Sequence, residues 1–275
     1  MKKDSGIYII GFCVVVCLVC AVFVSSAAVG LKPLQEENQR LDKQKNVLSV
    51  AGLLPEGSVS KAQVEELFKK RIKPVVVSLK DHGVAEDIDP LTFDQQKAKS
   101  DPDQSTAAPK NPAGVQRIPN HALLYFVSSK DMAEDGSGFE LEQYIFPVEG
   151  KGLWSTLYGY LALAPDGNEI RGLTFYQHGE TPGLGGEVDN PVWQRKWLHR
   201  LAYYDPSEDD AVADYGKPQI QVIKGQAGPP SKDPFDVDGL SGATITSKGV
   251  SNLLQFWLGS NGFGPFIKEI AAKAS

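Results

Sequence analysis

The sequence predicts an α+β fold: a domain with a mainly antiparallel sheet flanked by helices, preceded by one N-terminal transmembrane helix. Two observations lead to this fold class. Strand-like segments follow one another through the middle of the chain, and helical patterns stand on both sides of them, unlike the βαβ alternation of parallel sheets. An uncharged, strongly apolar segment, residues 7–29, lies near the start of the chain.

The apolar segment is interpreted as a retained membrane anchor behind a short tail, residues 1–6. At 1.5 Å per residue it reaches about 34 Å, enough to span a bilayer core. A cleaved signal peptide ending near residues 25–28 is the alternative, but the apolar run is longer than a typical signal core. Lysines stand on both sides of the segment, so the positive-inside rule does not decide its orientation.

Composition excludes several classes of protein. The chain has 275 residues and a formal net charge of −6, and no basic run is interleaved with aromatic residues, which argues against binding nucleic acid. Its three cysteines, Cys13, Cys17 and Cys20, all lie in the apolar segment. They are interpreted as small apolar residues, and neither a disulfide framework nor a cysteine metal site is expected.

Residues 30–95 are expected to form a helical stalk and the start of the soluble domain, which should fold from about Leu53 onward. Leucines at heptad spacing predict the stalk, a capping box precedes a helix at 60–72, and residues 74–79 read as a strand. Residues 96–120 are polar, rich in proline and without periodicity. They predict a flexible insertion on the domain surface.

Residues 121–275 are expected to form the main domain. The predicted strands are 122–129, 139–150, 153–167, 168–178 and 218–225. Asp166-Gly167 is a turn signal that pairs the third and fourth strands as a hairpin. A helix is predicted at 191–202, and a last one is predicted from apolar residues at helical spacing after Val250, ending at Gly259.

The first candidate site is "HGETPGLGGEV", residues 178–188. Four glycines and a proline give a loop with positive φ angles whose backbone a flat ligand can approach, although a plain tight turn is the alternative. His178 and Glu180 suggest a metal site, but no third ligand stands at a recognisable spacing. We therefore expect no metal here, and His178 as a hydrogen-bonded structural group.

The second candidate site is the stretch 238–247, where four hydroxyl side chains precede the last helix. They are Ser241, Thr244, Thr246 and Ser247. Thr244 or Thr246 can cap the helix. A catalytic nucleophile would need a nearby base, which the local sequence does not offer. The third interpretation is an anion site at the helix N-terminus, where a threonine hydroxyl holds a phosphate as an ester.

These stretches carry a resemblance to a known family. "DGLSGATIT" (238–246) resembles the flavinylation motif of proteins that carry FMN as a phosphoester on threonine. "HGETPGLGGE" (178–187) and "GKGLW" (150–154) resemble their counterparts in the same FMN-binding domain. With the single span, the order is similar to that of the C subunits of the sodium-translocating NADH:quinone oxidoreductase, over the anchor and roughly residues 120–260. The G subunits of Rnf complexes are close relatives.

The resemblance implies a set of site residues. Thr244 would be the FMN acceptor, and a separate flavin transferase, using FAD and a divalent metal, would recognise Asp238 and Gly239. The other residues expected to bind FMN are Trp154, Glu180, Thr181, Gly183, Leu184, Gly185, Ser241, Gly242 and Ala243. For Trp154, a plain core aromatic is the alternative. Thr246 and Ser247 are expected in the first turn or cap of the helix, with Thr244 just ahead of it.

The function implied is that of a membrane-anchored flavoprotein subunit that relays electrons one at a time within a redox pump and is inactive alone. Its partners would be other membrane subunits. No G-x-G-x-x-G follows a strand, so direct binding of NADH is not expected. The soluble domain would lie on the periplasmic side of the bacterial inner membrane. The alternatives are an Rnf G subunit, a membrane-tethered binding or assembly domain without redox function, and a secreted hydrolase using Ser241.

Overall fold

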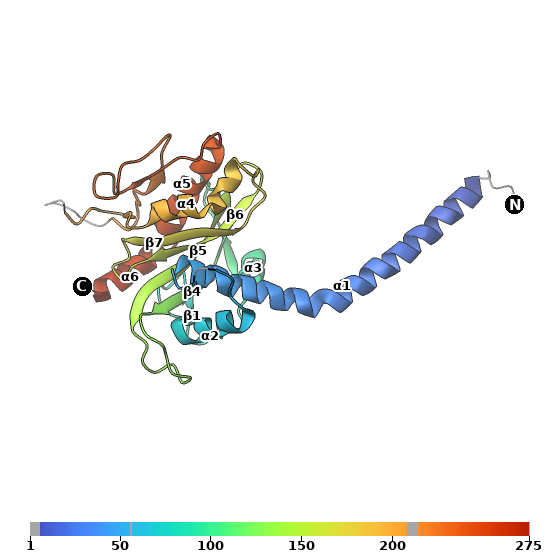
Figure 1. Cartoon of the computed structure of the whole chain (residues 1–275), viewed down its shortest axis with the longest axis horizontal. Helices are drawn as coiled ribbons and strands as arrows, with labels where there is room; N and C mark the ends of the chain where they lie inside the picture. The colour runs from blue at the N-terminus through green and yellow to red at the C-terminus, as the bar shows by residue number, and fades with distance from the viewer. Residues whose placement is uncertain (1–5, 56, 208–213, 275) are drawn as a thin grey trace. The chain divides into compact units, whose positions relative to one another are not determined.

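The computed structural model describes residues 6–55, 57–207 and 214–274. Its first helix, α1, covers Gly6–Val50 (Figure 1). The most apolar 18-residue window of this helix has a mean hydropathy of 3.1, so by length and composition the helix can cross a membrane. The predicted span and the predicted stalk are therefore parts of one helix.

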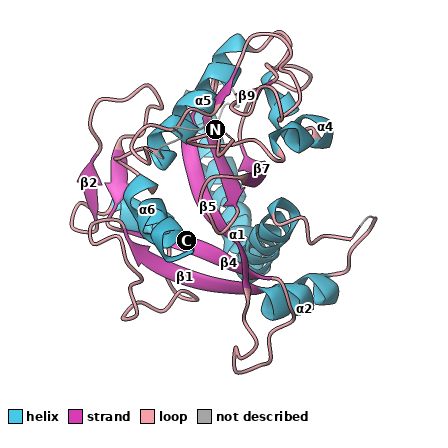
Figure 2. Cartoon of the chain, turned by 90° about the vertical axis from the view of Figure 1, so that its left-hand side faces the viewer, coloured by secondary structure: helices cyan, strands magenta, loops and turns pink. Residues whose placement is uncertain are grey.

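Five antiparallel strands form the central sheet, in the order β1-β4-β5-β6-β7 (Figure 2). The strands are β1 (Ile72–Ser78), β4 (His121–Ser128), β5 (Leu141–Lys151), β6 (Thr156–Leu163) and β7 (Ile170–Gln177). Strands β4 to β7 follow one another as antiparallel neighbours, and the turn between β6 and β7 contains Gly167 at φ 70°. The predicted hairpin and the predicted α+β class are confirmed.

Helices cover both faces of this sheet. One face packs against α5 (Thr244–Leu258) and α6 (Gly264–Ala274), and the other against α2 (Lys61–Arg71) and the end of α1 (Figure 2). Because side chains alternate along a strand, β5 serves both cores: Phe146 lies in the α5 core and Ile145 in the α1 core.

Helix α5, which begins beside the second candidate site, forms because its apolar residues recur at helical spacing. Five apolar residues of its buried face are each at most 1% exposed: Val250, Leu253, Leu254, Trp257 and Leu258. The helix ends at Gly259, as predicted, where the glycine amide donates to the carbonyl of Phe256 at 3.3 Å.

Two other predicted helices differ in outcome. Helix α2 begins at the predicted capping box, in which Ser60 Oγ accepts from the amide of Gln63 and Gln63 Oε1 accepts from the amide of Ser60. The helix predicted over 191–202 is shorter. A single α turn, α4 (Pro191–Gln194), passes into a 3-10 turn, η2 (Arg195–Trp197), and helical structure then ends.

The strand predicted at 218–225 is also shorter. Only β8 (Gln221–Val222) is paired, in parallel with β9 (Asp236–Val237). Strand β9 leads directly into the stretch 238–247, so this small parallel pair fixes where that stretch leaves the domain core.

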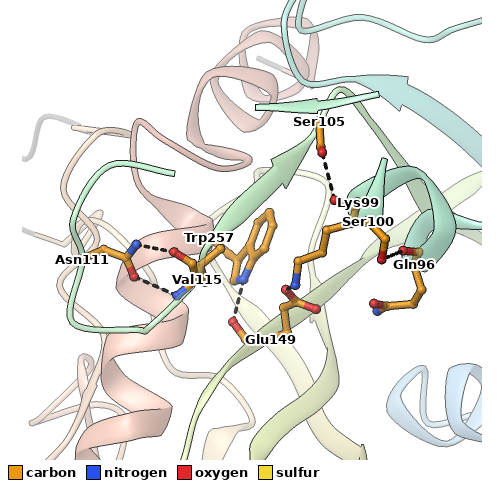
Figure 3. A network of polar contacts seen from close by, with 8 residues as sticks. All are labelled: Gln96, Lys99, Ser100, Ser105, Asn111, Val115, Glu149 and Trp257. Atoms are coloured by element: carbon orange, nitrogen blue, oxygen red, sulfur yellow. Dashed lines mark hydrogen bonds and ion pairs between the residues drawn. The ribbon is translucent and has the colours of Figure 1, made fainter. Parts of the chain in front are cut away.

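Residues 96–120 are a folded part of the domain, and the prediction of a flexible insertion is wrong. They contain most of α3 (Gln95–Ser100), then β2 (Ser105–Ala107) and β3 (Arg117–Pro119). The composition is polar, but the segment buries small side chains, and Ala113 is fully buried. Its polar side chains mostly bond the backbone of the segment itself, as Asn111 does in Figure 3.

Figure 3 shows how this segment is joined to the sheet and to α5. Lys99 of α3 forms an ion pair with Glu149 of β5, and the main-chain carbonyl of Glu149 accepts from Trp257 Nε1 at 2.8 Å. The amide of Lys151 donates to the carbonyl of Ala113 at 2.8 Å. The segment therefore supports the end of β5, which leads into the "GKGLW" stretch (150–154).

The compact unit that contains the sheet begins before Leu53. The chain divides into Met1–Lys43 and Gln44–Ser275, so the last residues of α1 belong to the domain. Val47 and Leu48 are fully buried in it. Gln143 Nε2 donates to the carbonyl of Ala51 at 2.9 Å, so a boundary at Leu53 would cut through the core.

We predict that a truncated protein beginning at Gln44 keeps the stability of the whole soluble unit, whereas one beginning at Leu53 does not. The shorter protein loses Val47, Leu48 and Val50, and burial of such side chains contributes about 1.5–3 kcal/mol each, so its free energy of unfolding should fall by at least about 3 kcal/mol. Urea unfolding of the two proteins measures the difference. Equal midpoints and equal slopes would show that the end of α1 adds nothing.

Candidate functional site

The carboxylate of Glu180 joins three separate parts of the chain. Glu180 follows β7 and is 5% exposed. It accepts hydrogen bonds from three consecutive amides of the turn between β5 and β6, at Leu153 (3.2 Å), Trp154 (2.9 Å) and Ser155 (3.2 Å). It also accepts from the hydroxyl of Thr246, in the first turn of α5, at 2.6 Å. The two candidate sites of the sequence and the "GKGLW" stretch therefore meet at this one side chain.

Glycines allow these parts to come so close. A Cβ placed on Gly152 would lie 2.6 Å from Glu180 Oε1, and one on Gly185 would lie 2.6 Å from Thr246 Oγ1. A Cβ on Gly249, in α5, would lie 2.4 Å from the carbonyl oxygen of Lys151. In the loop itself only Gly183 has a positive φ, 75°, so the expectation of several positive φ angles is wrong. Gly185 is required there by close approach rather than by backbone conformation.

Hydrogen bonds within the glycine-rich loop, and one to the turn after β5, also fix its conformation. His178 Nδ1 accepts from the amide of Glu180 at 3.1 Å, so Nε2 carries the proton and donates to Asp189 at 2.7 Å. The hydroxyl of Ser155 accepts from the amide of Gly179 at 2.6 Å. His178 is a hydrogen-bonded structural group, as predicted. Among the described residues, no three His, Cys, Asp or Glu side chains are grouped so that they could hold a metal ion.

Only two of the four hydroxyls at the second candidate site are accessible. Thr246 is fully buried and donates to Glu180, and Ser247 is 5% exposed and accepts from the amide of Leu240 at 3.0 Å. Both residues lie in the first turn of α5, as predicted, but their hydroxyls bond other parts of the chain and do not cap the amides of the helix. Ser241 and Thr244 are exposed.

Thr244 is the first residue of α5 and does not lie just ahead of the helix, where it was predicted. The residue before it, Ala243, has no side-chain oxygen, so no side chain at the cap position satisfies the first amides of the helix. These amides and the helix dipole are placed to receive an anion carried on the Thr244 hydroxyl.

Exposed apolar side chains stand on the parts that Glu180 joins. Leu153 is 47% exposed, Trp154 72%, Leu184 44% and Ile245 57%, so Trp154 is not a core aromatic. Gly242, at φ 70°, brings the stretch 238–247 close to the loop, since a Cβ on it would lie 2.9 Å from Leu184 Cδ2. Such a group of exposed apolar side chains is typical of a ligand site.

The remaining predicted site residues divide into two groups. Thr181 and Gly183 are exposed beside Leu184 on the loop, where a ligand can reach them. Asp238 is only 8% exposed and forms an ion pair with Lys196. It therefore stands behind the exposed stretch and is not a part of its surface.

Neither Lys196 nor the role of Thr246 was indicated by a pattern in the sequence. Lys196 stands 42 residues before Asp238, with no motif between them. Thr246 lies within the flavinylation-like stretch, but a hydroxyl near the start of a helix is more often a cap, and only the fold brings Glu180 to it.

The hydrogen bonds to Glu180 also set its ionisation. Burial raises the pKa of this carboxyl, but the bonds from the Thr246 hydroxyl and from the amides of Trp154, Leu153 and Ser155 lower it by more. The pKa of Glu180 therefore lies below its ordinary value of 4.5, and the side chain is a carboxylate at neutral pH.

Comparisons with known proteins identify the family to which the chain is similar. A family model described as an FMN-binding domain matches residues 152–259. The chain is 48% identical, over 93% of its length and 92% of the relative, to the C subunit of the Na(+)-translocating NADH-quinone reductase of Pseudomonas aeruginosa. It is 43% identical to the C subunit of the same reductase from Yersinia pestis, over 94% of this chain and 90% of that one. The crystal structure of Shewanella oneidensis NqrC superposes with a TM-score of 0.71 at 33% identity, covering 86% of this chain and all of that one.

We predict that Glu180→Gln lowers the free energy of unfolding at pH 7 by about 2 kcal/mol, because hydrogen bonds to a charged acceptor become bonds to a neutral one. The folded pKa of Glu180 is depressed, so its contribution to stability is complete above the ordinary pKa of 4.5 and is lost as the pH falls through the lower folded value. The difference between wild type and variant should therefore shrink below about pH 4.5.

Urea unfolding from pH 7 to pH 3 measures this difference. The matched control is Glu86→Gln, which neutralises an exposed carboxylate and should change stability little at any pH. A Glu180→Gln deficit that stayed constant down to pH 3 would contradict the assignment of the shift to these bonds.

Proposed function

Because the chain belongs to the family of C subunits of Na(+)-translocating NADH-quinone reductases, we propose that it carries FMN as a phosphoester on Thr244. It is a flavoprotein subunit of such a reductase, and its role is electron transfer within the complex.

One observation carries the proposal: an accessible threonine hydroxyl stands at the start of a helix, next to a group of exposed apolar side chains. The phosphate of FMN on Thr244 would receive the first amides of α5 and would benefit from the helix dipole. The isoalloxazine would cover Trp154, Leu184 and Ile245, which water otherwise contacts. The phosphate of FMN would thus meet hydrogen-bond donors, and its ring would meet apolar side chains.

Other residues hold these contacts in place. Thr181, Gly183 and Gly185 shape the loop on which Leu184 stands, and Gly185 leaves room for the Glu180–Thr246 bond. Ser241, Gly242 and Ala243 form the approach to the acceptor. Glu180 acts on the loop and the helix, since its burial and its four hydrogen bonds leave it little capacity to bind flavin directly.

FMN accepts and releases electrons one at a time, and here it would supply the redox chemistry that the amino-acid side chains lack. A flavin transferase would attach it from FAD. The bond formed joins Thr244 Oγ1 to the phosphorus of the FMN half, the bond broken is the pyrophosphate P–O bond, and AMP leaves. The hydroxyl proton passes to a base of the transferase, so this chain needs no base of its own beside Thr244.

The family also supports a proposal for the remaining partners and the location. The apolar helix α1 fits a single-pass protein of the bacterial inner membrane. We infer that the other membrane subunits of the reductase contact this chain and that the unit Gln44–Ser275 lies on the periplasmic side.

We predict that Thr244→Ala abolishes covalent attachment, whereas Ser241→Ala leaves it intact. Both hydroxyls are exposed, but only Thr244 is the first residue of α5. Mass spectrometry of the tryptic peptide Asp233–Lys248, from protein made together with flavin transferase, should show the mass of an FMN phosphoester in wild type and in Ser241→Ala. Covalent flavin on the Thr244→Ala protein would refute the assignment.

We predict that the C-terminal end of the chain is periplasmic. Alkaline phosphatase, which is active only in the periplasm, should be active when fused after Ser275, and a reporter that is active only in the cytoplasm should be silent there. The opposite pattern would place the domain on the cytoplasmic side and would leave the flavin assignment untouched.

A further inference from the structure

The first two residues of the flavinylation-like stretch, Asp238 and Gly239, bond it to the rest of the domain. Both carboxylate oxygens of Asp238 are engaged: Oδ2 pairs with Lys196 Nζ, and Oδ1 accepts from the amide of Ala227 at 3.1 Å. The main-chain carbonyl of Asp238 accepts from the buried indole of Trp193 at 2.8 Å. Asp238 therefore has little left to offer an enzyme that approaches Thr244 from the solvent.

Gly239 is also fixed by contacts with the rest of the domain. Its amide donates to the carbonyl of Gly225 at 2.9 Å, and a Cβ on it would lie 2.4 Å from the carbonyl oxygen of Ile223. The stretch changes character immediately afterwards, since Ser241, Gly242 and Thr244 are all exposed. The two ends of the stretch thus differ: one is fixed to the domain and the other is presented to solvent.

We propose that Lys196 is a positioning residue for flavinylation, which fixes Asp238 so that the exposed part of the stretch is presented to the transferase in one conformation. This rests on the proposed function of Thr244. The acid of the motif is then required for its ion pair with Lys196, and the transferase meets the exposed part of the stretch that carries Thr244. Lys196 then acts together with the flavinylation-like stretch, although it lies 42 residues before Asp238 in the sequence.

The surroundings of the pair explain why the lysine is needed in this role. Lys196 and Asp238 lie in the wall of an open pocket of about 410 Å³, next to the segment 226–230. The Lys196 side chain is 38% exposed, so packing alone does not hold it, whereas Asp238 is nearly buried and needs a cation beside it. Arg200 lines the same pocket, but its guanidinium bonds the main-chain carbonyls of Gly228 and Asp233. Loss of the lysine would therefore break the direct ion pair of the buried carboxylate and would free the start of the stretch.

The neighbouring residue supplies a matched control. Arg195 lines the same pocket, is exposed, and makes no side-chain hydrogen bond or ion pair within the described residues. Arg195→Met removes one positive charge from the same turn, η2, without touching Asp238. A general effect of surface charge on the transferase would appear in both variants, and an effect of the ion pair would appear only in Lys196→Met.

The experiment measures the initial rate and the final extent of FMN incorporation into purified protein, with FAD, Mg²⁺ and flavin transferase. Lys196→Met should slow incorporation at least tenfold, and Arg195→Met should match wild type. Lys196→Arg keeps a positive charge beside Asp238 and should keep most of the wild-type rate of incorporation. Asp238→Asn should lose as much as Lys196→Met, and the double variant should lose no more than either single one, because both changes break one interaction.

Three results would overturn the proposal. If Lys196→Met accepts FMN at the wild-type rate while Asp238→Asn does not, the transferase reads Asp238 directly. If the losses of the two single variants multiply in the double variant, Lys196 touches the transferase independently. If wild type itself gains no covalent FMN at Thr244, the proposed function fails, and this result differs from a defect confined to Lys196→Met.

Amide hydrogen exchange separates local positioning from general unfolding. In Lys196→Met, exchange should accelerate for residues 239–243 and stay at wild-type values in β5, β6 and β7. Acceleration spread through the whole sheet would mean that the lysine merely stabilises the domain, which would also overturn the proposal.

Discussion

The carboxylate of Glu180 is the constraint on which the site depends. It is buried, it is charged at neutral pH, and its bonds join the loop after β7, in which it stands, to the turn after β5 and to the first turn of α5. A buried charge is tolerated only when donors surround it, so these three parts must stay close together while the domain is folded. The close approach in turn requires glycine at positions 152 and 185.

This arrangement explains how a stable domain can keep apolar side chains in contact with water. Trp154 and Leu184 stand on backbone that is fixed by Glu180 and by the His178–Asp189 bond, so they cannot collapse into the core. The turn that carries Trp154 joins β5 to β6 in the sheet. The segment 96–120 bonds the end of β5 through the carbonyl of Ala113 and the side chain of Lys99. A preformed surface of this kind binds a flat ring at little conformational cost.

Much of the fold could be predicted from the sequence because local patterns determine it. The spacing of apolar residues in α5, the turn at Gly167 and the capping box at Ser60 each act over a few residues, and each is confirmed. The pairing of Lys196 with Asp238 and the bond from Thr246 to Glu180 depend on residues brought together only by the fold. The segment 96–120 misled for a related reason, since a polar composition does not reveal that Lys99 meets Glu149.

The central claim is that FMN on Thr244 lies across the exposed apolar side chains that Glu180 holds in place. A crystal structure of the unit Gln44–Ser275 after treatment with flavin transferase and FAD tests it most directly. Density should continue from Thr244 Oγ1 through a phosphate at the start of α5 to a ring that covers Trp154 and Leu184, with the bonds of Glu180 unchanged. A ring that projects into solvent, or that lies against Glu180 after its bonds to Trp154 and Thr246 have broken, would contradict the account.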